Sequence, residues 1–184
     1  MSDPIQQFSA GSQTVGPFFR IGLEWLIDSA PAVSGKNAIR IQGRVLDRDG
    51  APVPDAMLEF WCPAVSSPAG SSEGGFPACF RRAATDAEGN YSVTMHRPLA
   101  VAMDDGRSQA PHLLVLVFCR GLLRHLLTRV YLCGQPENTA DPVLQAVPPA
   151  RQNTLLAQPC GDGAETYRWN VILQGPGETV FFAW

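Results

Sequence analysis

The stretch SQAPHLLVLVF, residues 108–118, places a histidine at the entrance of an apolar segment, directly after a proline. In a β-strand, side chains at positions i and i+2 project from the same face, so two histidines with this spacing can bind one metal ion. Here the second position holds Leu114. His112 is open to three interpretations: a ligand whose partners lie elsewhere, a remnant of a lost metal site, or a core histidine. A lone imidazole is a poor metal site, which favours the third.

Two arginines near apolar segments are candidates for binding an anion. Arg120 ends the apolar segment in VFCRG, and Arg129 lies inside LLTRVYL. A guanidinium binds a carboxylate through paired N–H donors, so Arg120 is either a carboxylate-binding residue or a strand-end arginine exposed to water. Arg129 is expected to pair with an internal carboxylate instead. In a continuous strand, Arg120 lies roughly 26 Å from His112, too far for both to serve one small site.

Other polar groupings lack the spacing that their chemistry requires. Asp104 and Asp105 are adjacent in a loop, which does not fix the separation that two catalytic carboxylates need. The serines of the loop at 63–78 carry no nucleophile-elbow motif. The five cysteines and His125 lack zinc-ligand spacing, and no C-x-x-C occurs. We therefore expect the cysteines to be reduced thiols in a cytoplasmic protein.

The composition indicates a globular protein with one domain. The chain has 184 residues, of which 45% are hydrophobic and 17% charged, and its 17 glycines and 16 prolines favour many turns over long helices. A net charge of -3 gives no reason to expect nucleic acid or an anionic membrane as a partner. The start, MSDPIQQFSAGSQ, lacks the basic and apolar segments of a secretory signal.

The elements that must position these residues are mostly strands. Alternation or apolar runs predict strands at 39–45, 56–62, 79–85, 90–95, 111–119, 125–132, 166–173 and 178–184. The segments on either side of the DAEG turn at 86–89 are expected to form a hairpin. The strand at 111–119 is nearly all apolar, so both of its faces should be covered. The last segment, ETVFFAW, is either sandwich core or a subunit interface.

Outside the strands we expect loops, an arm and one or two short helices. DPVLQAV predicts a helix with Asp141 as N-cap and Pro142 at its first position. Long loops are expected at 63–78 and 96–109. The predicted fold class is all-β, an antiparallel β-sandwich of about eight strands, with an N-terminal arm at 1–37 and the sandwich domain at 38–184.

Four stretches, taken in order, resemble the intradiol ring-cleavage dioxygenases. They are SQTVGPFFRIGL (12–23), GRVLDRDGAPVPDAMLEFW (43–61), QAPHLLVLVFCRGLLRHLLTRVYL (109–132) and YRWNVILQGPGETVFF (167–182). The second stretch alone is common in transthyretin-like sandwiches, whereas the ordered set is much more specific. The resemblance covers most of the chain outside the two long loops and implies the sandwich fold of that family.

The chain departs from the metal-binding pattern of this family. Members that carry iron bind Fe(III) through two tyrosines and the two histidines of an H-x-H on a strand. His112 matches the first histidine and Leu114 takes the place of the second, while 62–90 and 92–111, where the tyrosines are expected, contain none. The tyrosines present fall in strand patterns instead: Tyr91, Tyr131 and Tyr167. The resemblance therefore implies an alpha subunit that has no metal ligands and no catalytic residues, with Fe(III) on a homologous beta subunit.

The resemblance also implies a reaction and a substrate-binding role for this chain. The complex would use O2 to cleave protocatechuate to 3-carboxy-cis,cis-muconate. Thr14, Gly16 and Pro17 of the arm would line the substrate pocket of the beta subunit, and Arg120 would bind the substrate carboxylate. The alternative is a transthyretin-like module that binds a ligand or a partner and catalyses no reaction.

Overall fold

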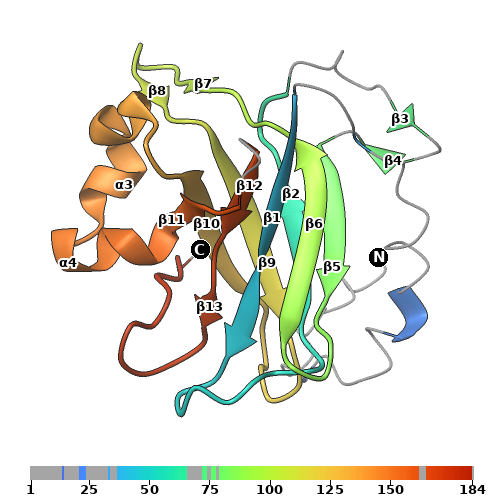
Figure 1. Ribbon diagram of the computed structural model, residues 1–184. Coiled ribbons are helices and arrows are strands. Elements are labelled where there is room, and N and C mark those ends of the chain that lie inside the picture. The colour runs from blue at the N-terminus through green and yellow to red at the C-terminus, as the bar shows by residue number, and fades with distance from the viewer. Residues whose placement is uncertain are drawn as a thin grey trace, which may run out of the picture.

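The computed structural model describes Thr14, Val33 and residues 21–23, 37–65, 72–73, 76–77, 79–161 and 165–183. Among the regular elements of the described chain, short strands predominate, and the short helices α3 and α4 lie together on one side of them (Figure 1). The arm at 1–37 falls largely outside the described residues, so its division from the domain at 38–184 stays a prediction.

Nine strands form one sheet. They are β1 (Ala38–Leu46), β2 (Met57–Trp61), β5 (Phe80–Ala84), β6 (Asn90–His96), β9 (His112–Phe118), β10 (Leu126–Leu132), β11 (Leu156–Pro159), β12 (Thr166–Arg168) and β13 (Val171–Ile172). Their order is β13-β1-β12-β11-β10-β9-β2-β5, and β6 pairs with β1. Strands β5 and β6 lie against each other without a ladder of hydrogen bonds, so the sheet is nearly closed.

This closure corrects the predicted architecture. The all-β class is confirmed, but the two layers of a sandwich are not, because β11 and β12 join both sides of the molecule into one barrel-like sheet. The hairpin predicted around 86–89 is also wrong. Its turn exists, with the Asp86 N–H donating to the Asn90 carbonyl, but β5 pairs with β2 and β6 pairs with β1.

Smaller elements complete the described fold. Two-stranded ribbons pair β3 (Ser72–Glu73) with β4 (Phe76–Pro77) and β7 (Val101–Ala102) with β8 (Ser108–Gln109). Four short helices lie between β10 and β11, namely η1 (Pro136–Ala140), α3 (Pro142–Ala146), α4 (Pro149–Gln152) and η2 (Asn153–Leu155), and residues 21–23 are also helical. Among the residues that the structure describes, no helix has the length and apolar composition needed to span a lipid bilayer.

The C-terminal segments differ from the sequence prediction. Residues 166–173 form two short strands separated at Trp169, whose N–H donates to the Gln42 carbonyl of β1. Residues 178–183 are not a strand and make a single bridge, between Phe182 and Leu127. Their apolar side chains are half-buried against the core, which is why the pattern looked like a strand.

The hydrophobic core fills the inside of the curled sheet, and β9 contributes three inward side chains to it. Leu113, Val115 and Val117 are fully buried among the core residues of the other strands. Leu114 and Leu116 point to the opposite face and are half-buried. The prediction that both faces of this strand are covered therefore holds for the inner face, whereas the outer face is covered only in part among the described residues.

Gly43 allows β1 to approach the segment between β12 and β13. A Cβ at this position would lie 1.7 Å from the carbonyl oxygen of Trp169, which also accepts a hydrogen bond from the Tyr91 hydroxyl. We expect Gly43→Ala to destabilise the fold by about 1–3 kcal/mol, because backbone must move to admit the methyl group. Urea unfolding measures this loss. Gly22→Ala is the control, since its Cβ meets nothing within 4 Å; equal midpoints for the two variants would contradict the prediction.

Candidate functional site

His112 lies at the first position of β9 and is buried. Its exposed fraction is 1%, and its Nδ1 lies 2.7 Å from the Ala110 carbonyl oxygen. The ring packs beside that of Tyr131, with 5.6 Å between centroids. Burial lowers the pKa of the imidazole, so the fold holds the neutral ring, whose Nδ1–H donates to Ala110. These contacts are those of a core histidine, the third of the interpretations above.

A buried carboxylate fixes the chain on either side of this histidine. Asp141 is fully buried, and its Oδ1 accepts hydrogen bonds from the N–H groups of Val143 and Leu144, which confirms the predicted N-cap of α3. The same oxygen accepts from the Tyr131 hydroxyl at 3.1 Å, and Oδ2 accepts from the Ala110 N–H at 2.8 Å. Asp141 therefore ties α3 to β10 and to the entrance of β9.

The described residues around His112 do not fit a ferric ion. Leu114 presents an aliphatic side chain at the position two residues along the same face. Burial raises the pKa of Tyr131, so its phenol stays protonated and donates to Asp141 instead of offering an anionic oxygen. Within the described ranges, no three His, Cys, Asp or Glu side chains gather closely enough to hold a metal ion. That the chain binds no iron stays a prediction.

Arg120 lies in the turn that follows β9, at the end opposite to His112. Its side chain is 71% exposed, and its Nε lies 3.1 Å from Oδ2 of Asp55, whose side chain is only 16% exposed. The guanidinium is therefore held through its Nε, and the rest of it is open to solvent. Such an arrangement leaves N–H donors for an external carboxylate.

Thr14 lies beside the same turn. The Gly121 N–H donates a hydrogen bond to the Thr14 hydroxyl oxygen at 3.2 Å. The structure thus brings together two of the four predicted substrate-binding residues, although 106 positions separate Thr14 from Arg120 in the sequence. Gly16 and Pro17 lie outside the described residues. Sequence reasoning missed Asp55, because nothing in the sequence around Arg120 indicates a partner so distant along the chain.

The other predicted polar residues have local roles. Arg129 does not pair with an internal carboxylate as predicted: its Nη1 donates to the Gln109 side-chain oxygen at 2.8 Å and contacts the Tyr131 hydroxyl at 3.5 Å. Asp105, in the segment predicted to be a loop at 96–109, forms an exposed ion pair with Arg107 at 2.7 Å. All five cysteines are free thiols.

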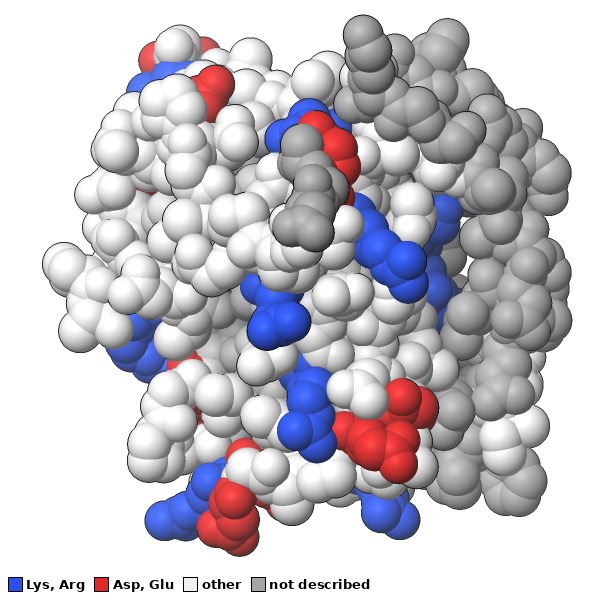
Figure 2. All heavy atoms as spheres, viewed as in Figure 1, with Lys and Arg blue, Asp and Glu red and all other residues white. Residues whose placement is uncertain are grey.

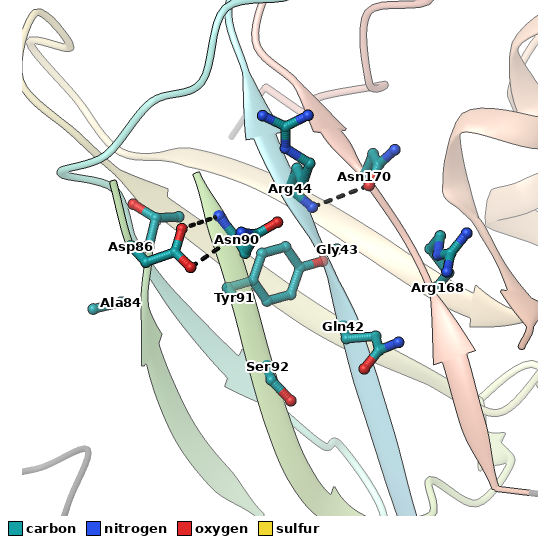
Figure 3. A pocket seen from close by; sticks show the side chains of 11 residues that line it. Gln42, Gly43, Arg44, Ala84, Asp86, Asn90, Tyr91, Ser92, Arg168 and Asn170 are labelled. Atoms are coloured by element: carbon teal, nitrogen blue, oxygen red, sulfur yellow. Dashed lines mark hydrogen bonds between the residues drawn. The ribbon is translucent and has the colours of Figure 1, made fainter. Parts of the chain in front are cut away.

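A polar groove of about 800 Å³ lies over β1, β6 and β12. Arg44 and Arg168 flank Asn170 along it, and Asp86 holds Asn90 at the other side (Figure 3). Basic side chains are spread over this face of the molecule (Figure 2). Because a sheet face turned to water normally carries polar side chains, the groove by itself indicates no ligand.

Comparison with known proteins identifies the family. A family model described as "Dioxygenase" matches residues 28–175 of the chain. The chain belongs to the intradiol dioxygenase family. It is similar to the protocatechuate 3,4-dioxygenase alpha chains of Burkholderia cepacia, at 38% identity over 93% of this chain and 95% of the relative, and of Pseudomonas putida, at 34% identity over 93% and 94%.

Two weaker similarities were also found. The protocatechuate 3,4-dioxygenase beta chain of Burkholderia cepacia is 26% identical, over 77% of this chain and 66% of the relative. The crystal structure of catechol 1,2-dioxygenase from Pseudomonas arvilla C-1 superposes with a TM-score of 0.59 at 21% identity, over 80% of this intradiol dioxygenase chain and 55% of that one. The last similarity concerns the fold alone.

Proposed function

We propose that this chain is the alpha subunit of a protocatechuate 3,4-dioxygenase and works only together with a homologous beta subunit. The observation that carries the proposal is its similarity to two alpha chains over 93% of its length, at 38% and 34% identity. The weaker similarity to a beta chain supports a partner of related sequence. The complex uses O2 to cleave protocatechuate between its two hydroxyl-bearing carbons, giving 3-carboxy-cis,cis-muconate.

In this proposal the ferric ion belongs to the beta subunit and this chain supplies binding groups. Arg120 offers guanidinium N–H donors to the substrate carboxylate, and the ion pair with Asp55 restricts the orientation of the guanidinium. The arm at 1–37, through Thr14, Gly16 and Pro17, lines the partner's pocket beside Arg120. The hydrogen bond between Thr14 and Gly121 supports this part of the proposal. Five free thiols favour the cytoplasm as the compartment.

Purification with and without the beta subunit tests the proposal. Alone, the chain should hold no stoichiometric iron, show no ring-cleaving activity, and self-associate, because the interfaces of obligate partners are large and hydrophobic. Co-expressed with beta, it should purify at equal stoichiometry with one iron per pair and show the colour of a tyrosinate–Fe(III) centre. The measurements are elemental analysis, the visible spectrum and O2 uptake with protocatechuate.

The control is the beta subunit expressed alone, which should bind iron but turn protocatechuate over less efficiently. About one tightly held iron per chain in the isolated alpha subunit would refute the proposal that the ferric ion belongs to the beta subunit. A stable monomer that ignores the beta subunit would instead support the alternative, a transthyretin-like binding module without enzymatic activity.

A further inference from the structure

The outer face of β2, β9 and β10 carries an apolar cavity of about 350 Å³. Among the described residues, the cavity is lined by Trp61, Cys62, Pro63, Leu114, Leu116 and Leu127. This surface is unlike the polar outer face over β1 and β6, where alternating side chains are exposed to water. An apolar hollow on the outside of a sheet is suited to an apolar ligand.

The register of the strands places three of the relevant side chains in one row. Trp61 of β2 and Arg129 of β10 lie opposite Leu114 of β9, one on each side. Two strand spacings, about 10 Å, therefore separate the Cα atoms of Trp61 and Arg129. Trp61 is 37% exposed and its ring packs against that of Phe80, which leaves a flat aromatic surface at the cavity.

Arg129 supplies a cation at the other end of this row. One nitrogen of its guanidinium, Nη1, is held by Gln109 and Tyr131, and no carboxylate within the described ranges forms an ion pair with it. Two carboxylates belong to the neighbouring elements: Glu59 of β2 and Asp141, the N-cap of α3. Glu59 forms an ion pair with Arg82, and Asp141 accepts four hydrogen bonds, one of them from the Tyr131 hydroxyl. The charge of Arg129 is thus available to an anion.

We propose that this cavity binds a small aromatic carboxylate. The aromatic ring of the ligand packs on the Leu114 side chain and against the Trp61 ring, and its carboxylate accepts hydrogen bonds from the Arg129 guanidinium. A benzoate-sized molecule spans a row of this length, with its apolar part over the leucines and its charge at the arginine. The site is not catalytic and goes beyond the proposed function, because Arg120 lies at the other end of β9 and serves the partner's pocket.

Fluorine NMR with 4-fluorobenzoate tests the site in the full chain, purified together with its beta subunit. Arg129→Gln should weaken binding of the probe at this site by at least about tenfold, which corresponds to about 1.4 kcal/mol. The glutamine retains a donor for Gln109 but has no charge. The matched control is Arg168→Gln, which removes an exposed arginine of β12 that forms no ion pair with a carboxylate in the described part of the chain. The probe 4-fluorobenzyl alcohol, which lacks the charge, should bind wild type and Arg129→Gln equally weakly.

A second variant keeps the test decisive if Arg129→Gln unfolds. Leu116→Trp fills the cavity while leaving Arg129 in place, so it should abolish binding of 4-fluorobenzoate without changing the melting temperature by more than a few degrees. Probe that binds at a ferric ion in the beta subunit is distinguished from probe in this cavity, because the paramagnetic ion broadens its fluorine signal. Unchanged affinity in Leu116→Trp, or in a folded Arg129→Gln, overturns the proposal. Ring-cleaving activity is recorded separately, so a failed proposed function would not be mistaken for a failed site.

Discussion

Replacing Asp141 with alanine is expected to lower the free energy of unfolding by about 2–5 kcal/mol. Loss of the N-cap of α3 contributes about 1–2 kcal/mol. The Ala110 N–H and the Tyr131 hydroxyl would also be left without their acceptor in a buried site, which costs about 1–3 kcal/mol. For a domain of this size each kcal/mol corresponds to about 2–4 °C, so the melting temperature should fall by roughly 10 °C.

Two variants show whether the loss comes from these hydrogen bonds. Asp141→Asn keeps the carbonyl oxygen that caps α3 but replaces Oδ2 by an amide nitrogen, which cannot accept from Ala110; its loss should be intermediate. Asp104→Ala removes an exposed loop carboxylate and should leave the melting temperature unchanged. Calorimetry of the three variants should rank Asp141→Ala lowest. An Asp141→Ala variant as stable as Asp104→Ala would mean that water replaces the carboxylate at little cost.

Local patterns predicted the elements that depend on neighbours in sequence. Asp141 followed by Pro142 identified the start of α3, and the apolar run of β9 identified a strand with two apolar faces. The same reasoning failed at 178–183, because half-buried aromatics in an irregular segment show the alternation of a strand. It also failed at the turn around 86–89, since a turn sequence does not specify which strands pair beyond it.

The contacts of the candidate site could be predicted less well. Arg120 was identified as a carboxylate-binding candidate, but its tether to Asp55 joins two turns that are 65 residues apart. The Gly121–Thr14 hydrogen bond spans 107 residues. Arg129 was expected to pair with a carboxylate, but it donates a hydrogen bond to the side-chain oxygen of Gln109 instead. Single-sequence patterns describe the faces of each strand, whereas these contacts depend on how separate segments meet in space.

Replacing Arg120 with alanine is expected to lower kcat/KM for protocatechuate by about 10- to 100-fold in the assembled complex. A hydrogen bond to a charged group is worth about 1.5–3 kcal/mol, and each 1.4 kcal/mol is a factor of ten. Catechol has no carboxylate, so the same variant should lose much less with catechol. The matched control is Arg124→Ala, which removes an exposed arginine from the same connection between β9 and β10 and should affect neither substrate.

The ion pair between Arg120 and Asp55 requires one more variant. Exposed ion pairs contribute only about 0–1 kcal/mol to stability, but Oδ1 of Asp55 is buried without a hydrogen-bond partner among the described residues, so loss of Arg120 would leave this carboxylate unpaired. Asp55→Asn combined with Arg120→Ala removes that charge. If Arg120 binds substrate, the double variant should show the same selective loss on protocatechuate as the single one. Recovery of activity in the double variant, or equal losses on both substrates, would mean that Arg120 acts through packing or assembly. No loss on either substrate would leave it a solvent-exposed arginine at the end of a strand.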